Sequence, residues 1–398
     1  MLYSGFSIDY NVVCSTGGGP DAGCRRGWKA MTEREKMLSG ALYRAGAPEL
    51  VQARRRAKEL CSRFNQEAVQ DPEAGARLLR ELLGEVCRRF DVARDAEVTV
   101  ECNPDSVEKK MLCRLRRAGV NRISLGVQST DDACLRALGR IHTWQQVQEA
   151  VAACRRAKFP DVSLDLIYGL PGQTMEQWEK TLSDALTLQP EHLSCYGLKL
   201  EEGTPLYRQR DSLTLPDDEA QADMYLYAVE YLRQNGYEQY EISNFARPGH
   251  ASRHNLKYWT LGEYAGFGPG AYSDFGGVRY GYIRDLDRYI AGELVLAESE
   301  HIPVSEREME YIMLRLRTTE GMNIREFENR FRRRFDPLGA RLEVYAGHGL
   351  AQRTEQGWRL TPRGFLVSNQ IIGELQELLN REKLERLRRA QEGDYRVV

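Results

Sequence analysis

Short β-branched segments alternate with helical patterns between residues 97 and 200, and this alternation constrains the fold more than any other feature. The candidate strands lie at 97–101, 122–126, 162–167 and 192–200. The segments between them show helical periodicity, at 111–118, 133–138, 147–157 and 175–188. A further helix is expected at 219–235, followed by a strand at 237–242. Such alternation favours an α/β fold, with a parallel sheet and helices on its outer face.

Composition narrows the class of protein. The 398 residues are enough for two or three domains, and 42% hydrophobic with 29% charged residues is typical of a globular chain. A net charge of -2 offers no electrostatic attraction to nucleic acid or to an anionic membrane. No apolar run approaches the roughly 20 residues that span a bilayer. The polar, Gly-rich start does not resemble a signal peptide, so we expect a cytoplasmic protein that binds no nucleic acid.

Polar residues stand where the candidate strands end. Glu101 ends the first strand, Gln128 follows the second, and Asp165 lies in the third, before a Gly-Leu-Pro-Gly turn. Arg140 is expected to end a helix, in the sequence LGRIH. Ligands of parallel α/β sheets bind beyond the carboxyl ends of the strands, so these residues are binding candidates. The alternative is that they are ordinary polar residues at strand ends.

Five ordered motifs carry a family resemblance, and they are ECNPD (101–105), NRISLGVQS (121–129), LGRIH (138–142), LDLIYGLPGQT (164–174) and HNLKYW (254–259). Residues from about 88 to 380 resemble the radical S-adenosylmethionine heme chaperones, relatives of oxygen-independent coproporphyrinogen III oxidase. The resemblance implies an incomplete radical-SAM-type (β/α) barrel over 88–300. Of the family's six barrel strands, we expect this chain to keep the last four and to lack the first two.

The resemblance also implies roles for particular residues. The counterparts of Glu101, Gln128, Arg140 and Asp165 contact S-adenosylmethionine in the family. Carboxylates can accept hydrogen bonds from ribose hydroxyls and the ammonium group, and arginine can pair with the carboxylate. This chain has ECNP where the family has EANP, a small change beside Glu101.

The HNLKYW sequence matches a motif, HNxxYW, that the resemblance links to heme binding. The imidazole of His254 could ligate heme iron, and Tyr258 and Trp259 could stack on a porphyrin. The alternative is that His254 packs against the barrel and that the aromatic residues belong to its core.

The cysteines do not supply the family's metal centre, a 4Fe–4S cluster held by the motif CxxxCxxC. That motif occurs nowhere in the sequence, and the cysteines stand at 14, 24, 61, 87, 102, 113, 134, 154 and 195. Clustered thiolates normally come from short spacings. We therefore expect scattered reduced thiols, no functional cluster, and no catalytic or metal-binding residue.

The sequence patterns at the two ends of the chain differ from the pattern of the barrel segment. Residues 1–30 lack periodicity and are expected to be disordered, whereas 31–87 read as helices similar to the N-terminal cap of maltose O-acetyltransferases. Residues 301–380 predict helices at 305–317, 324–331 and 365–379 around a hairpin, which together look like a winged helix. The lack of a strong excess of basic residues favours a packing role for this part over DNA binding. Residues 381–398 predict a charged helical tail.

Three hypotheses of function stay open on the sequence. The first is a truncated member of the family, involved in heme handling or porphyrin biosynthesis but without its cluster. The second is a non-catalytic heme-binding protein that uses His254, and the third is a fusion of gene fragments with no evolved activity. Expected partners are heme or porphyrin and a heme-acceptor protein. A second copy of the chain is also possible, because strand 97–101 would present an unpaired sheet edge.

Overall fold

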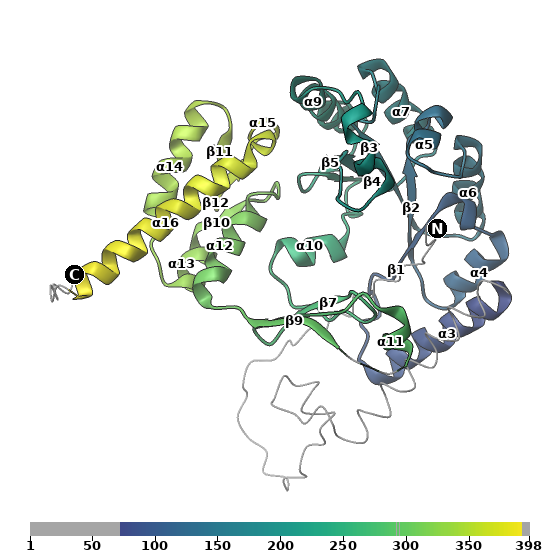
Figure 1. The fold of residues 1–398 in the computed structure, drawn as a ribbon, viewed down its shortest axis with the longest axis horizontal. Coiled ribbons are helices and arrows are strands. Elements are labelled where there is room, and N and C mark those ends of the chain that lie inside the picture. The colour runs from purple at the N-terminus through teal and green to yellow at the C-terminus, as the bar shows by residue number, and fades with distance from the viewer. Residues whose placement is uncertain (1–71, 292, 294, 392–398) are drawn as a thin grey trace, which may run out of the picture. The chain divides into compact units, whose positions relative to one another are not determined.

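The computed structural model describes residues 72–291, 293 and 295–391 (Figure 1). The disorder expected over 1–30 and the helices expected over 31–71 lie outside the described residues. The chain divides into two compact units. The first unit takes in the described residues up to 126, with 145–162 and 263–301. The second unit takes in 127–144, 163–262 and the described residues from 302 onward.

The main sheet has the parallel strands that the sequence predicts. β1 (Thr99–Cys102) pairs in parallel with β2 (Arg122–Gln128), and β3 (Asp161–Tyr168) pairs in parallel with β4 (His192–Gly197). The strand order is β1-β2-β3-β4-β6-β5. Val127, Leu164 and Leu193 are fully buried, as expected for strands covered on both faces. The α/β fold class is thereby confirmed.

Within the strand expected at 237–242, only Glu238–Gln239 forms a strand, and a second short strand follows beyond that range. β5 (Glu238–Gln239) and β6 (Asn244–Ala246) run antiparallel to each other, and β6 also runs antiparallel to β4. Between the two strands, the N–H of Tyr240 donates to the carbonyl of Asn244 in β6, but the carbonyl of Tyr240 and the N–H of Ile242 bond to Thr319 and Arg317 instead. A tertiary contact therefore overrides the local strand pattern.

Helices precede and follow the strands at the positions that periodicity predicts. They are α3 (Pro72–Arg89), α4 (Lys109–Arg117), α5 (Asp132–Ala137), α6 (Trp144–Arg156), α7 (Met175–Thr187) and α9 (Asp218–Gln234). Side-chain caps begin several of them: Asp131 accepts from two backbone N–H groups of α5, and Thr174 forms a capping box with Gln177 at α7. Shorter helical turns are η1 (Pro104–Ser106), α8 (Pro205–Arg208), η2 (Arg210–Ser212), α10 (Arg253–Trp259) and α11 (Leu286–Ile290).

The first unit also contains a small antiparallel sheet that the sequence did not predict. Its strands are β7 (Tyr272–Phe275), β8 (Val278–Tyr282) and β9 (Leu296–His301), in that order. Glycines interrupt the apolar pattern before and within these strands, and every residue of β9 is exposed. Alternation of buried and exposed side chains is therefore too weak here to mark strands.

The C-terminal part of the second unit combines helices with a three-stranded sheet, as a winged helix does. The elements are α12 (Val304–Arg315), β10 (Met322–Asn323), α13 (Ile324–Phe331), α14 (Asp336–Gly347), β11 (Ala351–Arg353), β12 (Gly357–Leu360), α15 (Pro362–Leu366) and α16 (Ser368–Gln391). The expected hairpin is present as β11 and β12, and α14 was not predicted. Buried Tyr311, Phe327 and Trp358 lie in its core.

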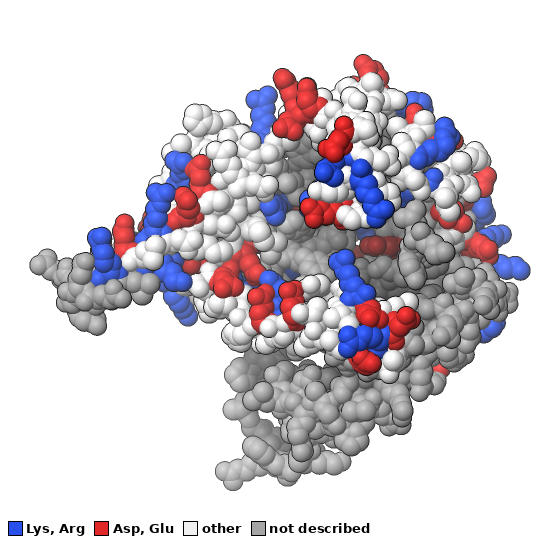
Figure 2. Space-filling view, viewed as in Figure 1, with Lys and Arg blue, Asp and Glu red and all other residues white. Residues whose placement is uncertain are grey.

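The charged tail is not a separate element over the residues that the structure describes. α16 runs without a break from Ser368 to Gln391, so the segment from 381 onward continues the preceding helix. Charges of both signs are interspersed over the face in view in Figure 2, in keeping with a net charge of -2. Among the described helices, none combines the length and the apolar composition that crossing a bilayer requires.

Candidate functional site

A row of polar side chains crosses the sheet of the second unit. Asp165 of β3 is the register partner of Ser194 of β4, and Ser194 is in turn the partner of Asn244 of β6. Register partners on neighbouring strands project from the same face. The hydroxyl of Ser194 donates to Oδ1 of Asp165 at 2.7 Å. Asp165 is thus held by its neighbour in the sheet, at a position that the sequence singled out.

Glu241 continues this row and is itself buried, with 1% of its surface exposed. The amide of Asn244 donates to one carboxylate oxygen, and the backbone N–H of Ser243 donates to the other at 2.8 Å. Burial raises the pKa of Glu241, whereas hydrogen bonds from Ser243, Asn244 and the side chain of Trp259 oppose that rise. The carboxylate therefore joins the sheet to the last residue of α10.

Tyr196 also belongs to β4 and lies two residues beyond Ser194. Desolvation of its hydroxyl and then the negative charge of Asp165 raise the pKa of Tyr196 to about 12. The phenol, like that of an ordinary tyrosine, is neutral at physiological pH and can donate a hydrogen bond.

Gln128 and Arg140 come from neighbouring parts of the second unit. Gln128 ends β2 in the left-handed region, with φ 64°, where non-glycine residues are uncommon and often belong to functional sites. Nε2 of His142 lies 3.2 Å from the carbonyl oxygen of Val127, which fastens the LGRIH loop to the end of β2. Arg140 does not end a helix, because α5 stops at Ala137 and Arg140 lies beyond the turn that follows it.

Glu101 lies in the first unit, unlike the other candidates for S-adenosylmethionine binding. It is an exposed residue of β1 and the register partner of Ser124 in β2. Gln128, Arg140 and Asp165 all lie in the second unit. Convergence of the four side chains on one ligand stays a prediction.

The HNLKYW motif forms the short helix α10, and its residues divide between two sides. Side chains four residues apart share a helix face. His254 and Tyr258 meet edge to face, with ring centroids 4.8 Å apart, and Tyr258 is 37% exposed. On the other side, the amide of Asn255 donates to the hydroxyl of Tyr240 at 3.5 Å, and Trp259 bonds to Glu241. Asn255 and Trp259 therefore anchor the helix, and His254 pairs with a partly exposed aromatic ring.

A buried side-chain relay reaches the same helix and was not anticipated from the sequence. The hydroxyl of Ser163 lies 2.7 Å from Nδ1 of His192, and Nε2 of His192 lies 2.8 Å from the hydroxyl of Tyr240. Ser163 and His192 are each 1% exposed, so the pair braces the sheet rather than meeting a substrate. One signal was available: polar residues recur at every second position of β4, in His192, Ser194 and Tyr196.

The cysteines of the described residues do not form a set of cluster ligands. Cys102, Cys154 and Cys195 are buried, and burial raises the pKa of Cys102 and of Cys154 to about 12. Thiols with such pKa values stay protonated, whereas metal ligands are thiolates. Over the described ranges, no three His, Cys, Asp or Glu residues gather in a way that could hold a metal ion. Cys14, Cys24 and Cys61 lie outside those ranges.

Comparison with known proteins gives the family. The model of the radical SAM superfamily matches residues 44–185, and that of the HemN C-terminal domain matches 303–367. The heme chaperone HemW of Lactococcus lactis is 36% identical over 308 residues, which cover 75% of this chain and 80% of that protein. HemW of Bacillus subtilis is 36% identical over 305 residues, covering 74% and 80%.

A solved structure supports the fold. Coproporphyrinogen III oxidase (HemN) from Escherichia coli, a radical SAM enzyme, superposes with a TM-score of 0.65 at 20% identity, over 85% of each chain. The chain therefore belongs to the HemW/HemN-like family of radical S-adenosylmethionine proteins. The resemblance inferred from the five motifs is confirmed.

Proposed function

We propose that this protein handles heme and binds it through His254 of α10. The observation that carries the proposal is the division of the HNLKYW helix into an anchored side and a side with His254 and a partly exposed Tyr258. An imidazole can supply an axial ligand to heme iron, and an aromatic ring beside it can contact the porphyrin. Relatives named heme chaperones, 36% identical to this chain, support the same function.

Replacing His254 by alanine should abolish the ligand-dependent shift of the heme Soret band. The reason is that the variant loses the imidazole and keeps the helix, since Asn255 and Trp259 anchor α10 from the other side. Heme titration followed by absorption spectroscopy measures the effect. His348, an exposed residue of the C-terminal part, provides the matched control, and His348→Ala should leave the spectrum unchanged. A His254→Ala spectrum identical to that of the parent protein would rule out this ligand.

We further propose that Glu101, Gln128, Arg140 and Asp165 descend from an S-adenosylmethionine site that works here without a cluster. The absence of CxxxCxxC from the sequence and the protonated, buried thiols of the described residues support this reading. The cluster does not fit these residues, so no reductive cleavage is assigned to the chain. The four residues could still contact the nucleoside and the methionine carboxylate.

Anaerobic reconstitution with iron and sulfide should yield no cleavage of S-adenosylmethionine to 5′-deoxyadenosine. Without the chelating iron, we expect an affinity no better than roughly millimolar, or about 4 kcal/mol of binding free energy. Product chromatography and calorimetry measure the two quantities. Stoichiometric iron and sulfide together with 5′-deoxyadenosine would refute the proposal, and micromolar binding would refute only its estimate of affinity.

We make further proposals on the partner, the location and the self-association of the protein. A chaperone must release its heme, so we propose a heme-acceptor protein as partner. We also propose that the chain is cytoplasmic, and that copies can pair through β1. That strand stands at the end of the main sheet within the part of the chain that the structure describes, and a terminal strand can pair with another edge.

A further inference from the structure

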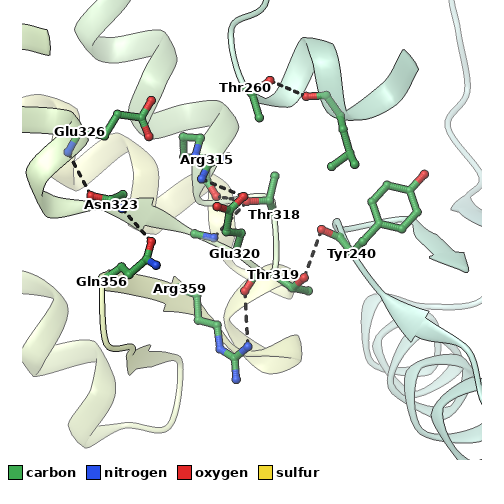
Figure 3. Close-up of polar contacts among 12 residues, drawn as sticks. Tyr240, Thr260, Arg315, Thr318, Thr319, Glu320, Asn323, Glu326, Gln356 and Arg359 are labelled. Carbon is green, nitrogen blue, oxygen red and sulfur yellow. Dashed lines mark hydrogen bonds and ion pairs between the residues drawn. The ribbon is translucent and has the colours of Figure 1, made fainter. Parts of the chain in front are cut away.

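Residues 240–242 connect α10 to the C-terminal part of the second unit. The backbone N–H of Ile242 donates to the carbonyl of Arg317 at 2.9 Å, and the N–H of Thr319 donates to the carbonyl of Tyr240 at 3.1 Å. Glu241 and Thr318 form an antiparallel bridge between these two bonds. Figure 3 shows Thr319 also reaching the Tyr240 carbonyl with its hydroxyl, at 3.2 Å. The segment is thus fixed on its C-terminal-domain side by backbone bonds.

Further bonds tie the Thr319 side of this junction to the C-terminal domain. The guanidinium of Arg359 in β12 donates to the carbonyl of Thr319 at 3.4 Å, as Figure 3 shows. Arg315 of α12 pairs with Glu320 at 3.1 Å. Residues 317–320 are therefore held by both a helix and the small sheet of that domain.

The same segment holds α10 with its side chains. Tyr240 accepts from Asn255, and Glu241 bonds to Trp259, one helical turn further along. A helix of seven residues has little stability of its own, so tertiary anchors decide its orientation. Tyr240 and Glu241 are adjacent in the chain. Their side chains therefore contact α10, and their backbone connects the same segment to the C-terminal domain.

Glu241 accepts hydrogen bonds from several donors of the second unit. Ser243 and Asn244 bond to different oxygens of its carboxylate, and Trp259 adds a third donor. The site is buried, so water does not substitute for a lost acceptor, and an unsatisfied buried donor is costly. A carboxyl group has an acceptor oxygen at both positions, whereas a glutamine amide has an acceptor oxygen at one position and a donor nitrogen at the other.

We infer that Glu241 is a positioning residue for the heme site: it orients α10, and with it His254 and Tyr258, and it couples that helix to the C-terminal domain. The inference rests on the proposed heme function, because the orientation of α10 matters for ligation only if His254 is the ligand. In this role Glu241 does not have to contact the heme. It acts through Trp259, and Tyr240 acts through Asn255.

Substituting Glu241→Gln tests the inference with a nearly isosteric change. Glutamine turns an N–H₂ group toward a donor in place of an oxygen, so one hydrogen bond is replaced by a repulsive contact. We expect amide hydrogen exchange over residues 253–259 to accelerate about tenfold or more, and heme affinity to fall by a similar factor. Glu238→Gln is the matched control, since Glu238 is an exposed residue of neighbouring β5, and it should change neither quantity.

A double-mutant cycle with Trp259→Phe separates positioning from general destabilisation. Phenylalanine has no indole N–H, so Glu241→Gln should have a smaller effect on exchange in α10 and on the Soret band in that background. Equal effects in both backgrounds, or unaltered exchange over 253–259 in Glu241→Gln, would overturn the inference. Faster exchange in α10 with no heme binding by the unmodified protein would uphold the anchoring of the helix and refute the proposed function instead.

Discussion

Replacing Trp178 by alanine is expected to lower the free energy of unfolding by about 5 kcal/mol. The side chain is fully buried in α7, its ring lies 5.6 Å from that of Tyr168, and its indole N–H donates to the carbonyl of Met224 in α9 at 2.8 Å. Loss of an indole leaves a large cavity in addition to the lost burial. Because Trp178 joins α7 to α9, the cost should appear in the cooperative unfolding of the whole second unit.

Urea denaturation followed by circular dichroism measures this effect. Trp178→Phe is the matched control, since it retains most of the ring and loses only the hydrogen bond, at a cost of about 1–2 kcal/mol. A Trp178→Ala variant as stable as Trp178→Phe would show that the site collapses around the smaller side chain, contrary to the expected cavity.

Replacing Arg333 by methionine is expected to lower the free energy of unfolding by about 3–5 kcal/mol. The guanidinium bonds to Glu308 at 3.0 Å and to Glu382 at 2.7 Å, and it also donates to the carbonyl of Leu379 at 3.3 Å. Glu308 is 4% exposed, so removal of this cation leaves a buried carboxylate with much of its desolvation uncompensated. Arg333 therefore links α12, through Glu308, to α16, through Leu379 and Glu382.

Two comparisons make the Arg333 measurement specific. Arg334→Met removes the neighbouring, exposed arginine and its exposed ion pair with Asp336, and should cost less than about 1 kcal/mol. The double variant Glu308→Met with Arg333→Met should recover much of the lost stability, because both buried charges are gone. Equal losses for Arg333→Met and Arg334→Met in thermal or urea unfolding would disprove the importance of the buried pair.

The candidate site was only partly accessible from the sequence. Strand-end position indicated Asp165 and Gln128, and motif resemblance indicated Arg140 and His254, because local pattern marks where strands end and which residues flank them. Glu241 and Tyr240 escaped notice because their partners lie elsewhere in the chain: Trp259 and Asn255 on α10, and Thr318 and Thr319 beyond α12. The residues around 240 contain no local pattern that predicts those contacts.

The sequence by itself determined the parallel α/β sheet, the helices between its strands and the family, since periodicity and short motifs are properties of local chain segments. Only the tertiary structure decided that the strand expected at 237–242 shortens to Glu238–Gln239, that a small sheet forms from β7, β8 and β9, and that α16 continues past 381. It also decided which side of α10 is anchored. These outcomes depend on backbone and buried side-chain hydrogen bonds between distant residues, where the cost of an unsatisfied donor outweighs local preference.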